Sequence, residues 1–424
     1  MINYTKLSYL VKREILNFSE RICKGLKKPE SKLICNMLYG VSESGSCHLS
    51  QIGRALKEGI SLKKTIERLS RGLSDFSEYE QRKLLDNNAQ IVGKYINEKT
   101  IYTIDGSDVT KPSSNALECL DLVRDGSTGK IEKGYFTVEI AALTQESKTP
   151  VSVYDRVYSA KEEGFISEDE EVLHGLRYLS EKFGRQGIRT MDRGYDALVY
   201  YEYFLKKQEK FIIRATKNRN VCYNGETRNI LEVAKLFKGK YRIDFKDKKG
   251  RTIECKTSII PVSLPKHPKQ MLNLVVVFGF GNDPMLLLTN LMSDDPRLSN
   301  TVTKVYLMRW RIEEYFRFKK QQYGFEGFRV RSLNSIRMLH RILTLLSSLI
   351  GILSEKRCDS MFVWELIEAS KRIYRPKKDK AKRKFLNYAI ADGIFVVLRK
   401  TLVGISGFFP CPLNNSLQIS LFIP

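Results

Sequence analysis

The run IYTID (residues 101–105) begins a series of strand-like segments that decides the fold of this chain. Each segment is short and rich in β-branched or aromatic residues, and turn residues separate it from the next. Helical periodicity appears before and after the fourth segment, at 168–183 and 196–207. The later strand-like segments are GYFTVEIAAL (134–143), PVSVYDRVYS (150–159), GIRTMD (187–192) and KFIIRAT (210–216). The order β-β-β-α-β-α-β predicts an α/β domain built on a mixed five-stranded sheet.

Two aspartates end strands that this order places side by side. The order is typical of the ribonuclease-H fold, and if the first and fourth strands are adjacent and parallel, Asp105 and Asp192 meet. Two-metal phosphoryl transfer needs carboxylates placed close together, because they must hold two ions about 4 Å apart. Asp108 competes with Asp105 for this role. Asp196 competes with Asp192, although Asp196 is better placed to cap the helix that follows.

A third acidic ligand is expected from VYLMRWRIEEYFRFKK (305–320), which lies in a predicted helix over 301–322. At about 100° per residue, one narrow stripe of this helix contains Tyr306, Arg309, Glu313 and Lys320. Glu313 can complete a metal site from this stripe, whereas the adjacent Glu314 lies off it. A solvated helix face with Glu–Lys pairs is the ordinary alternative. The coincidence with two strand-ending aspartates favours the site.

The spacing Y-x₂-R-x₃-E-x₆-K over residues 306–320 resembles the Y-R-E-K signature of bacterial insertion-sequence DDE transposases. The sequences IDGSD around Asp105 and MDRGYD around Asp192 are similar to the same family, so the resemblance spans about residues 101–329. It implies a retroviral-integrase-like core with a β-strand insertion. It also implies Mg²⁺ or Mn²⁺ at a two-metal site, cleavage at the terminal inverted repeats of an element and joining of the 3′-OH to target DNA, often through a hairpin.

Matching positions assign metal binding and catalysis to Asp105, Asp192 and Glu313 by resemblance. The DNA contacts expected near the cut end are Tyr306, Arg309, Lys320, Arg193 and Arg317. Some relatives hold a flipped base with a Trp of the insertion, but the two Trp of this chain are Trp310 and Trp364. Phe278 or Phe280 would have to take that role. A homodimer on DNA is expected by resemblance as well.

The domain organisation follows from where the periodicity changes. We expect a helical DNA-binding domain over 1–97 and a catalytic core over 98–330, interrupted by a β-rich insertion over 217–291. A helical region over 331–424 is expected to serve dimerisation or DNA contacts. Its predicted helices are 333–354, 362–373 and 385–402, with a basic loop at 374–384.

Residues 49–73, LSQIGRALKEGISLKKTIERLSRGL, have the pattern of a helix-turn-helix within the N-terminal region. Gly59 marks the turn, and Ser61 is expected to cap the second helix. This motif places its second helix in the major groove of DNA, which makes Lys63, Lys64 and Arg68 candidate DNA contacts. An ordinary basic helical hairpin is the alternative.

Composition favours a polyanion as partner. The 424 residues carry 72 Lys and Arg against 48 Asp and Glu, a net charge of +24, and a basic surface attracts a phosphate backbone. The most apolar run, ILTLLSSLIGIL (342–353), falls short of the ~20 residues that span a bilayer and is expected to be a buried helix. The N-terminus lacks the apolar core of a signal peptide. We therefore expect no membrane partner and a bacterial, cytoplasmic, nucleoid-associated protein.

Two other functions fit the same residues. One is a nuclease or resolvase on a ribonuclease-H-like fold that lacks strand transfer. The other is a non-catalytic DNA-binding regulator derived from a transposase. The intact set of three acidic residues disfavours the regulator, and inverted repeats flanking the reading frame would favour transposition over the nuclease.

Overall fold

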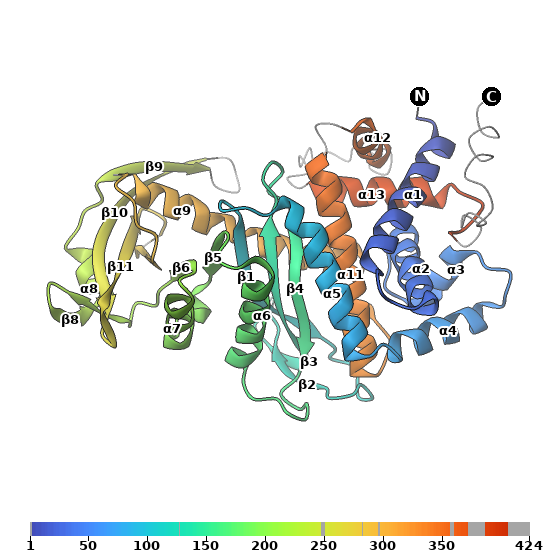
Figure 1. The fold of residues 1–424 in the computed structure, drawn as a ribbon, viewed down its shortest axis with the longest axis horizontal. Coiled ribbons are helices and arrows are strands. Elements are labelled where there is room, and N and C mark those ends of the chain that lie inside the picture. Colours follow the sequence, from blue (N-terminus) through green and yellow to red (C-terminus); the bar gives the residue numbers. More distant parts are fainter. Residues whose placement is uncertain are drawn as a thin grey trace. The chain divides into compact units, whose positions relative to one another are not determined.

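The computed structural model describes residues 2–126, 128–246, 251–281, 283–295, 297–356, 360–371 and 386–405. It has two compact units (Figure 1). One unit combines Met1–Asn87 with Lys319–Pro424, and the other is Asn88–Phe318. The N-terminal and C-terminal helical regions, separate in the sequence, therefore belong to one unit, which we call the helical unit. We call the other the sheet unit.

The sheet unit is built on the five strands that the sequence predicts. They are β1 (Ile101–Thr110), β3 (Ile131–Leu143), β4 (Pro150–Tyr158), β5 (Ile188–Met191) and β6 (Lys210–Arg214). Their order across the sheet is β4-β3-β1-β5-β6. The strands β1, β3 and β4 pair antiparallel, whereas β5 runs parallel to both β1 and β6. A short strand that the sequence did not indicate, β2 (Asp121–Arg124), also pairs with β3.

The predicted β-rich insertion does not form a sheet of its own. Its strands are β7 (Asn220–Tyr223), β8 (Glu226–Asn229), β9 (Tyr241–Lys246), β10 (Thr252–Leu264), β11 (His267–Phe278) and β12 (Met285–Thr289). It also contains a short helix, α8 (Ile230–Lys235). Because β12 pairs antiparallel with β6, the insertion extends the same sheet outward through β11 and β10.

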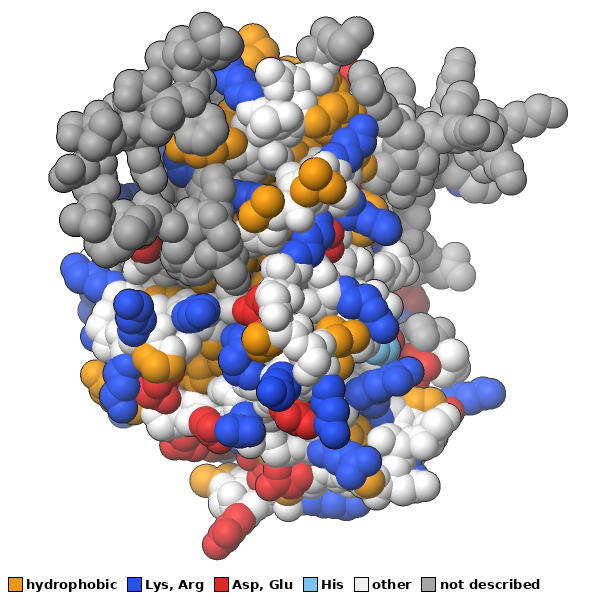
Figure 2. All heavy atoms as spheres, turned by 90° about the vertical axis from the view of Figure 1, so that its right-hand side faces the viewer, with side chains coloured by type: hydrophobic (Ala, Val, Ile, Leu, Met, Phe, Trp, Pro, Cys, Tyr) orange, Lys and Arg blue, Asp and Glu red, His pale blue; other side chains and the backbone are white. Residues whose placement is uncertain are grey.

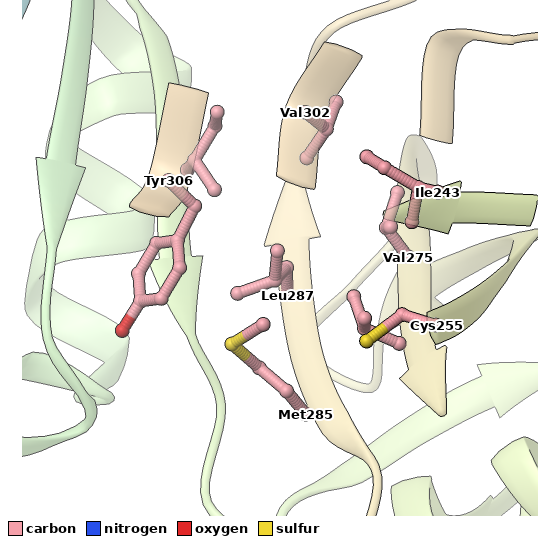
Figure 3. Packing of buried hydrophobic residues seen from close by; sticks show 9 residues of the cluster. Ile243, Cys255, Val275, Met285, Leu287, Val302 and Tyr306 are labelled. Carbon is pink, nitrogen blue, oxygen red and sulfur yellow. The ribbon is translucent and has the colours of Figure 1, made fainter. Parts of the chain in front are cut away.

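Helices pack against the strands of the sheet. The predicted helices before and after β5 are α6 (Glu168–Phe183) and α7 (Leu198–Lys207). Helix α6 packs against β3 and β4 (Figure 1). Helix α9 (Leu298–Met308) packs against β9, β10 and β11 of the insertion. Its Val302 and Tyr306 join a buried cluster that includes Val275 of β11 and Leu287 of β12 (Figure 3).

The single helix predicted over 301–322 is broken in the structure. Helix α9 ends at Met308, α10 is Arg311–Arg317, and a π-helical turn, η3, follows at Phe318–Gln322. At the break the Arg309 amide bonds to the Tyr306 carbonyl, three residues back rather than four. The prediction of one helix was wrong because the two halves pack differently: α9 on the insertion and α10 on β1 and β4.

The helical unit contains seven complete α-helices among its described residues. They are α1 (Tyr4–Ile22), α2 (Lys28–Ser44), α3 (Leu49–Leu56), α4 (Leu62–Ser74), α11 (Leu333–Glu355), α12 (Met361–Ser370) and α13 (Leu386–Arg399). A further helix, α5 (Glu78–Val92), begins in this unit. The predicted basic loop 374–384 lies outside the described residues.

Helix α11 contains the most apolar run of the sequence. It is the helix among the described residues that is long and apolar enough to cross a membrane, and 94% of that apolar window is buried inside the structure. It contacts α2, α4 and α13. The expectation of a buried helix is therefore confirmed.

An ion pair anchors β5 where the strand begins. Arg189 is fully buried, its Nε lies 3.1 Å from Glu209, and its guanidinium donates to the carbonyls of Gly184, Gln186 and Gly187. The guanidinium also lies over the Tyr102 ring of β1. These contacts join the start of β5 to the loop before it and to its neighbouring strand.

We expect Arg189→Leu to lower the free energy of unfolding by about 3–5 kcal/mol, because it leaves a buried carboxylate unpaired. Adding Glu209→Leu should recover part of that loss. Chemical denaturation of both variants measures the effect, with Lys210→Leu, which removes an exposed ion pair to Glu98, as the matched control. A loss of similar size in the control would contradict the role given to Arg189.

Candidate active site

Asp105 and Asp192 follow a directly paired position of two parallel strands. Ile104 of β1 lies opposite Met191 of β5, and the next residue on each chain is the aspartate. Asp105 accepts a hydrogen bond from the Gly106 amide at 3.0 Å, and Asp192 accepts one from the Arg193 amide at 2.6 Å. The parallel pairing of β1 with β5 thus brings the two carboxylates to the same end of the sheet.

Arg309 lies between these aspartates and Glu313. Its Nη1 is 2.7 Å from Oδ2 of Asp105, and its Nη2 is 3.6 Å from Oδ2 of Asp192 and 3.4 Å from Oε1 of Glu313. The Arg309 side chain is only 7% exposed, whereas those of Asp192 and Glu313 are more than one-third exposed. One buried cation therefore contacts three carboxylates that reach it from β1, β5 and α10.

Tyr306 connects this cluster to the insertion. Its ring packs beside Leu287 and Val302 with the hydroxyl directed away from them (Figure 3). That hydroxyl donates to Oδ1 of Asp192 at 3.3 Å. Because α9 rests on β10 and β11, the strands of the insertion determine where Tyr306 and Arg309 lie.

Burial and like charges set the electrostatics of the site. Burial raises the pKa of Asp105 from its ordinary 3.8 to about 6, and the nearby Asp192 and Glu313 add to the increase, while Arg309 opposes it. Burial and Asp192 raise the pKa of Tyr306 to about 12. Burial acts to lower the pKa of Arg309, but the carboxylates outweigh it and raise that pKa. At neutral pH Arg309 is a cation and Tyr306 a neutral donor.

Several other residues predicted for the site have partners outside the three carboxylates. Glu314 is buried and pairs with Arg317, so it is Glu313 that contacts Arg309. Lys320 belongs to the helical unit, where its ammonium lies 3.0 Å from Glu326. Arg193 is exposed in the turn after Asp192.

The two competing aspartates have other partners. Asp108 accepts a hydrogen bond from the Gly126 amide at 3.2 Å. The expectation that Asp196 caps the next helix was wrong, because Ala197 is the N-cap of α7 and makes no side-chain hydrogen bond. Asp196 instead accepts from Thr216 and Tyr201 and pairs with Arg219. It joins the turn after β5 to the chain after β6.

Sequence reasoning missed two buried acidic residues beside Asp105. Glu139 of β3 lies opposite Asp105, and Asp155 of β4 lies opposite Glu139, so that all three side chains are on one face of the sheet. Glu139 is 1% and Asp155 2% exposed. A charged residue inside each of the apolar runs GYFTVEIAAL and PVSVYDRVYS was the available signal.

A cavity of about 280 Å³ adjoins residues that follow each aspartate in the chain. Gly106, Ser107 and Asp108 line it from β1, and Gly194 and Tyr195 line it from the turn after Asp192. Its walls carry hydroxyl, carboxylate and aromatic groups. The chain next to each aspartate is therefore open to a bound molecule.

The two helices expected within residues 49–73 are α3 and α4, which contact each other. Ser61 caps α4 as predicted, and Lys63 and Lys64 are exposed in its first turn. Arg68 differs from them, because its guanidinium lies 2.6 Å from Glu58 in the turn between the helices. Basic side chains are spread over the face shown in Figure 2.

The chemistry of the three carboxylates suits a hard divalent cation, which prefers oxygen ligands. Among the described residues no three acidic, histidine or cysteine side chains are already arranged around one ion position. Arg309 explains this spacing, since the carboxylates surround its guanidinium.

This chain is similar to a family of known proteins and to a solved structure. No curated protein matches the chain. Among solved structures it is similar to the piggyBac transposase in a synaptic complex with hairpin DNA, with 10% sequence identity, a TM-score of 0.47, and coverage of 97% of this chain and 82% of that one. The family model of the transposase DDE domain matches residues 96–349. Because that match covers more than half of the 424 residues and contains all three clustered carboxylates, the chain belongs to the DDE-domain transposases.

Proposed function

We propose that this protein is a transposase in which Asp105, Asp192 and Glu313 bind divalent metal ions and catalyse cleavage and joining of DNA. The observation that carries the proposal is the convergence of these three carboxylates, from β1, β5 and α10, on one buried guanidinium. The strand order β4-β3-β1-β5-β6, with β5 parallel to both neighbours, supports a ribonuclease-H-like core. In the proposed reaction the enzyme cuts at the terminal inverted repeats of an insertion sequence and joins the 3′-OH ends to target DNA.

Mg²⁺ or Mn²⁺ would be held by the three carboxylates, and the bound ions would polarise the scissile phosphate and lower the pKa of the attacking water or 3′-OH. The residues of the chain supply the rest. Tyr306 orients Asp192 through its hydroxyl, and its raised pKa keeps it a donor. Arg309 offers a buried, permanently charged fork for a DNA phosphate beside the reacting group.

DNA contacts are proposed at two places. One group is assigned by resemblance to the transposase signature and consists of Tyr306, Arg309, Arg193, Arg317 and Lys320. In the N-terminal region, which we propose as a DNA-binding domain over 1–97, they are Lys63 and Lys64 of α4, with Arg68 positioning the turn through Glu58. The region 331–424 is proposed to serve dimerisation or further DNA contacts. We propose a homodimer acting on nucleoid DNA in a bacterial cytoplasm.

We expect Asp105→Asn, Asp192→Asn and Glu313→Gln each to abolish metal-dependent cutting of labelled DNA that carries the element's ends. Loss of one ligand of a two-metal site removes the charge that stabilises the transition state. Thermal unfolding and DNA binding are measured alongside to show that each variant folds. Asp108→Asn is the matched control, since Asp108 bonds to Gly126 and lies outside the cluster.

Cutting that persists in any of the three variants would reject that residue as a ligand. Cutting without joining in the wild type would favour the nuclease or resolvase, and DNA binding without cutting would favour the regulator.

The free energy of unfolding in EDTA should reveal the buried charge of Asp105. Its pKa of about 6 lies above the ordinary 3.8, so the folded protein holds this proton more tightly than the unfolded chain and loses stability as the pH rises between these values. Asp105→Asn lacks this loss. Relative to wild type, we expect the free energy of unfolding of Asp105→Asn to increase by about 1–3 kcal/mol between pH 4 and pH 7. A difference that stays constant with pH would contradict the prediction.

Substitution of Lys63 and Lys64 by Gln should weaken DNA binding and reduce its dependence on salt. Each lost phosphate contact lowers the slope of log K against log salt by about one. Binding to labelled duplex is measured across a salt series. Arg68→Gln provides the comparison, because its guanidinium is engaged by Glu58 and its loss should lower stability more than the salt slope.

A further inference from the structure

The position of Arg309 raises a question about how metal ions enter the site. The three carboxylates that we propose as ligands all contact one guanidinium, at 2.7, 3.6 and 3.4 Å. A guanidinium and a divalent ion seek the same oxygen lone pairs, so they cannot both use them fully. The ligands surround Arg309 instead of converging on an ion position.

The cluster needs a cation whether or not metal is bound. Three carboxylates this close repel one another, and Asp105 is mostly enclosed by protein. The guanidinium compensates part of this charge, and its own 7% exposure shows that it is built into the site rather than resting on its surface. Two divalent ions would supply four positive charges in its place and leave it without a need for these partners.

We propose that Arg309 is an internal counter-ion that occupies the carboxylate cluster until divalent metal displaces it, and that the displaced guanidinium then binds a DNA phosphate. This inference rests on the proposed function, since it takes the three carboxylates as metal ligands. Arg309 therefore competes with metal ions for the carboxylates. The same side chain opposes metal binding before DNA arrives and stabilises the DNA-bound state afterwards.

The local backbone suits a side chain with two positions. Arg309 lies at the junction where α9 has ended and α10 has not begun, outside the regular hydrogen-bond pattern of both helices. Tyr306 holds the end of α9 in the buried cluster, and α10 contacts β1. In this proposal the guanidinium leaves the carboxylates through side-chain torsions, while these contacts hold both helices in place.

Thermodynamic linkage requires metal binding and DNA binding to affect each other equally. If a phosphate stabilises the displaced position of Arg309, DNA must raise the affinity for metal, and metal must raise the affinity for DNA by the same factor. The carboxylate cluster then binds its full set of metal ions when DNA is present. This would limit unproductive metal-dependent cutting by the free protein.

The test measures Mn²⁺ binding to the full-length protein by electron paramagnetic resonance at pH 8 without DNA. We expect Arg309→Gln to bind Mn²⁺ about tenfold more tightly than the wild type, since one charge-assisted contact need no longer be broken. Arg309→Lys, which cannot span three carboxylates, should lie between them. Arg242→Gln is the matched control, because Arg242 also bridges two carboxylates, Asp244 and Glu254, but lies in the insertion strand β9.

Thermal unfolding provides a second readout. In EDTA, Arg309→Gln should melt at a lower temperature than the wild type, because the carboxylates lose their compensating charge. Saturating Mn²⁺ should remove most of that difference. An arginine with a merely structural role would lose the same stability in both conditions, and that result would overturn the inference.

A third measurement adds a short DNA duplex of arbitrary sequence. Duplex should tighten Mn²⁺ binding to the wild type and leave Arg309→Gln unchanged; equal tightening in both would contradict the linkage. The variant Asp192→Asn separates a failure of the counter-ion proposal from a failure of the proposed metal site. Mn²⁺ binding that survives this substitution, or that is absent from wild type and Arg309→Gln alike, rejects the proposed metal site itself. Binding that requires Asp192 but is no tighter in Arg309→Gln rejects the counter-ion alone.

Discussion

The parallel pairing of β1 with β5 is the constraint on which the rest of the site depends. Because Ile104 and Met191 are paired, the chain must place Asp105 and Asp192 at the same end of the sheet. Such proximity of like charges opposes folding unless a cation or a metal compensates it. Arg309 provides that compensation, and the insertion, through α9 and Tyr306, holds Arg309 where it is needed.

This dependence explains why a long insertion lies between the second aspartate and the glutamate. Strands β10 and β11 form the surface on which α9 rests, and β12 joins them to β6. The residues that contact the carboxylates are thus supported by the same sheet that carries two of those carboxylates. One network of backbone hydrogen bonds therefore joins the insertion strands that support α9 to the core strands that position the two aspartates.

The sequence predicted the parts of the structure that local patterns encode. The five core strands, the helices α6 and α7 and the Ser61 cap follow from residue types and their spacing. It did not predict that β12 would pair with β6, since either strand could pair with any free edge. The break after Met308 carries no Gly or Pro and arises from packing of the two halves on different strands. Asp196 looked like a helix cap because its partners Thr216 and Arg219 are distant in sequence.

The candidate site was predictable to a similar degree. The strand ends, the helical stripe and the resemblance together pointed to Asp105, Asp192 and Glu313, and the structure brings them to one guanidinium. The helical period also grouped Lys320 with them, but that period holds only in one uninterrupted helix, and the structure has a break and a π-helical turn there. Glu139 and Asp155 needed the register of three strands before their alignment with Asp105 became visible.

Strand β5 is hydrogen-bonded along both sides, to β1 and to β6, whereas α10 is a helix of 7 residues between a tight turn and a π-helical turn. Asp105 therefore lies within β1 and Asp192 directly follows β5, whereas Glu313 is carried by a short element with irregular backbone at both ends. In a phosphoryl transfer the phosphorus moves from the leaving oxygen toward the attacking oxygen, so the ligand distances that suit the reaction change as it proceeds. If the three carboxylates bind metal as we propose, Glu313 can follow that change without disturbing the sheet that positions the two aspartates.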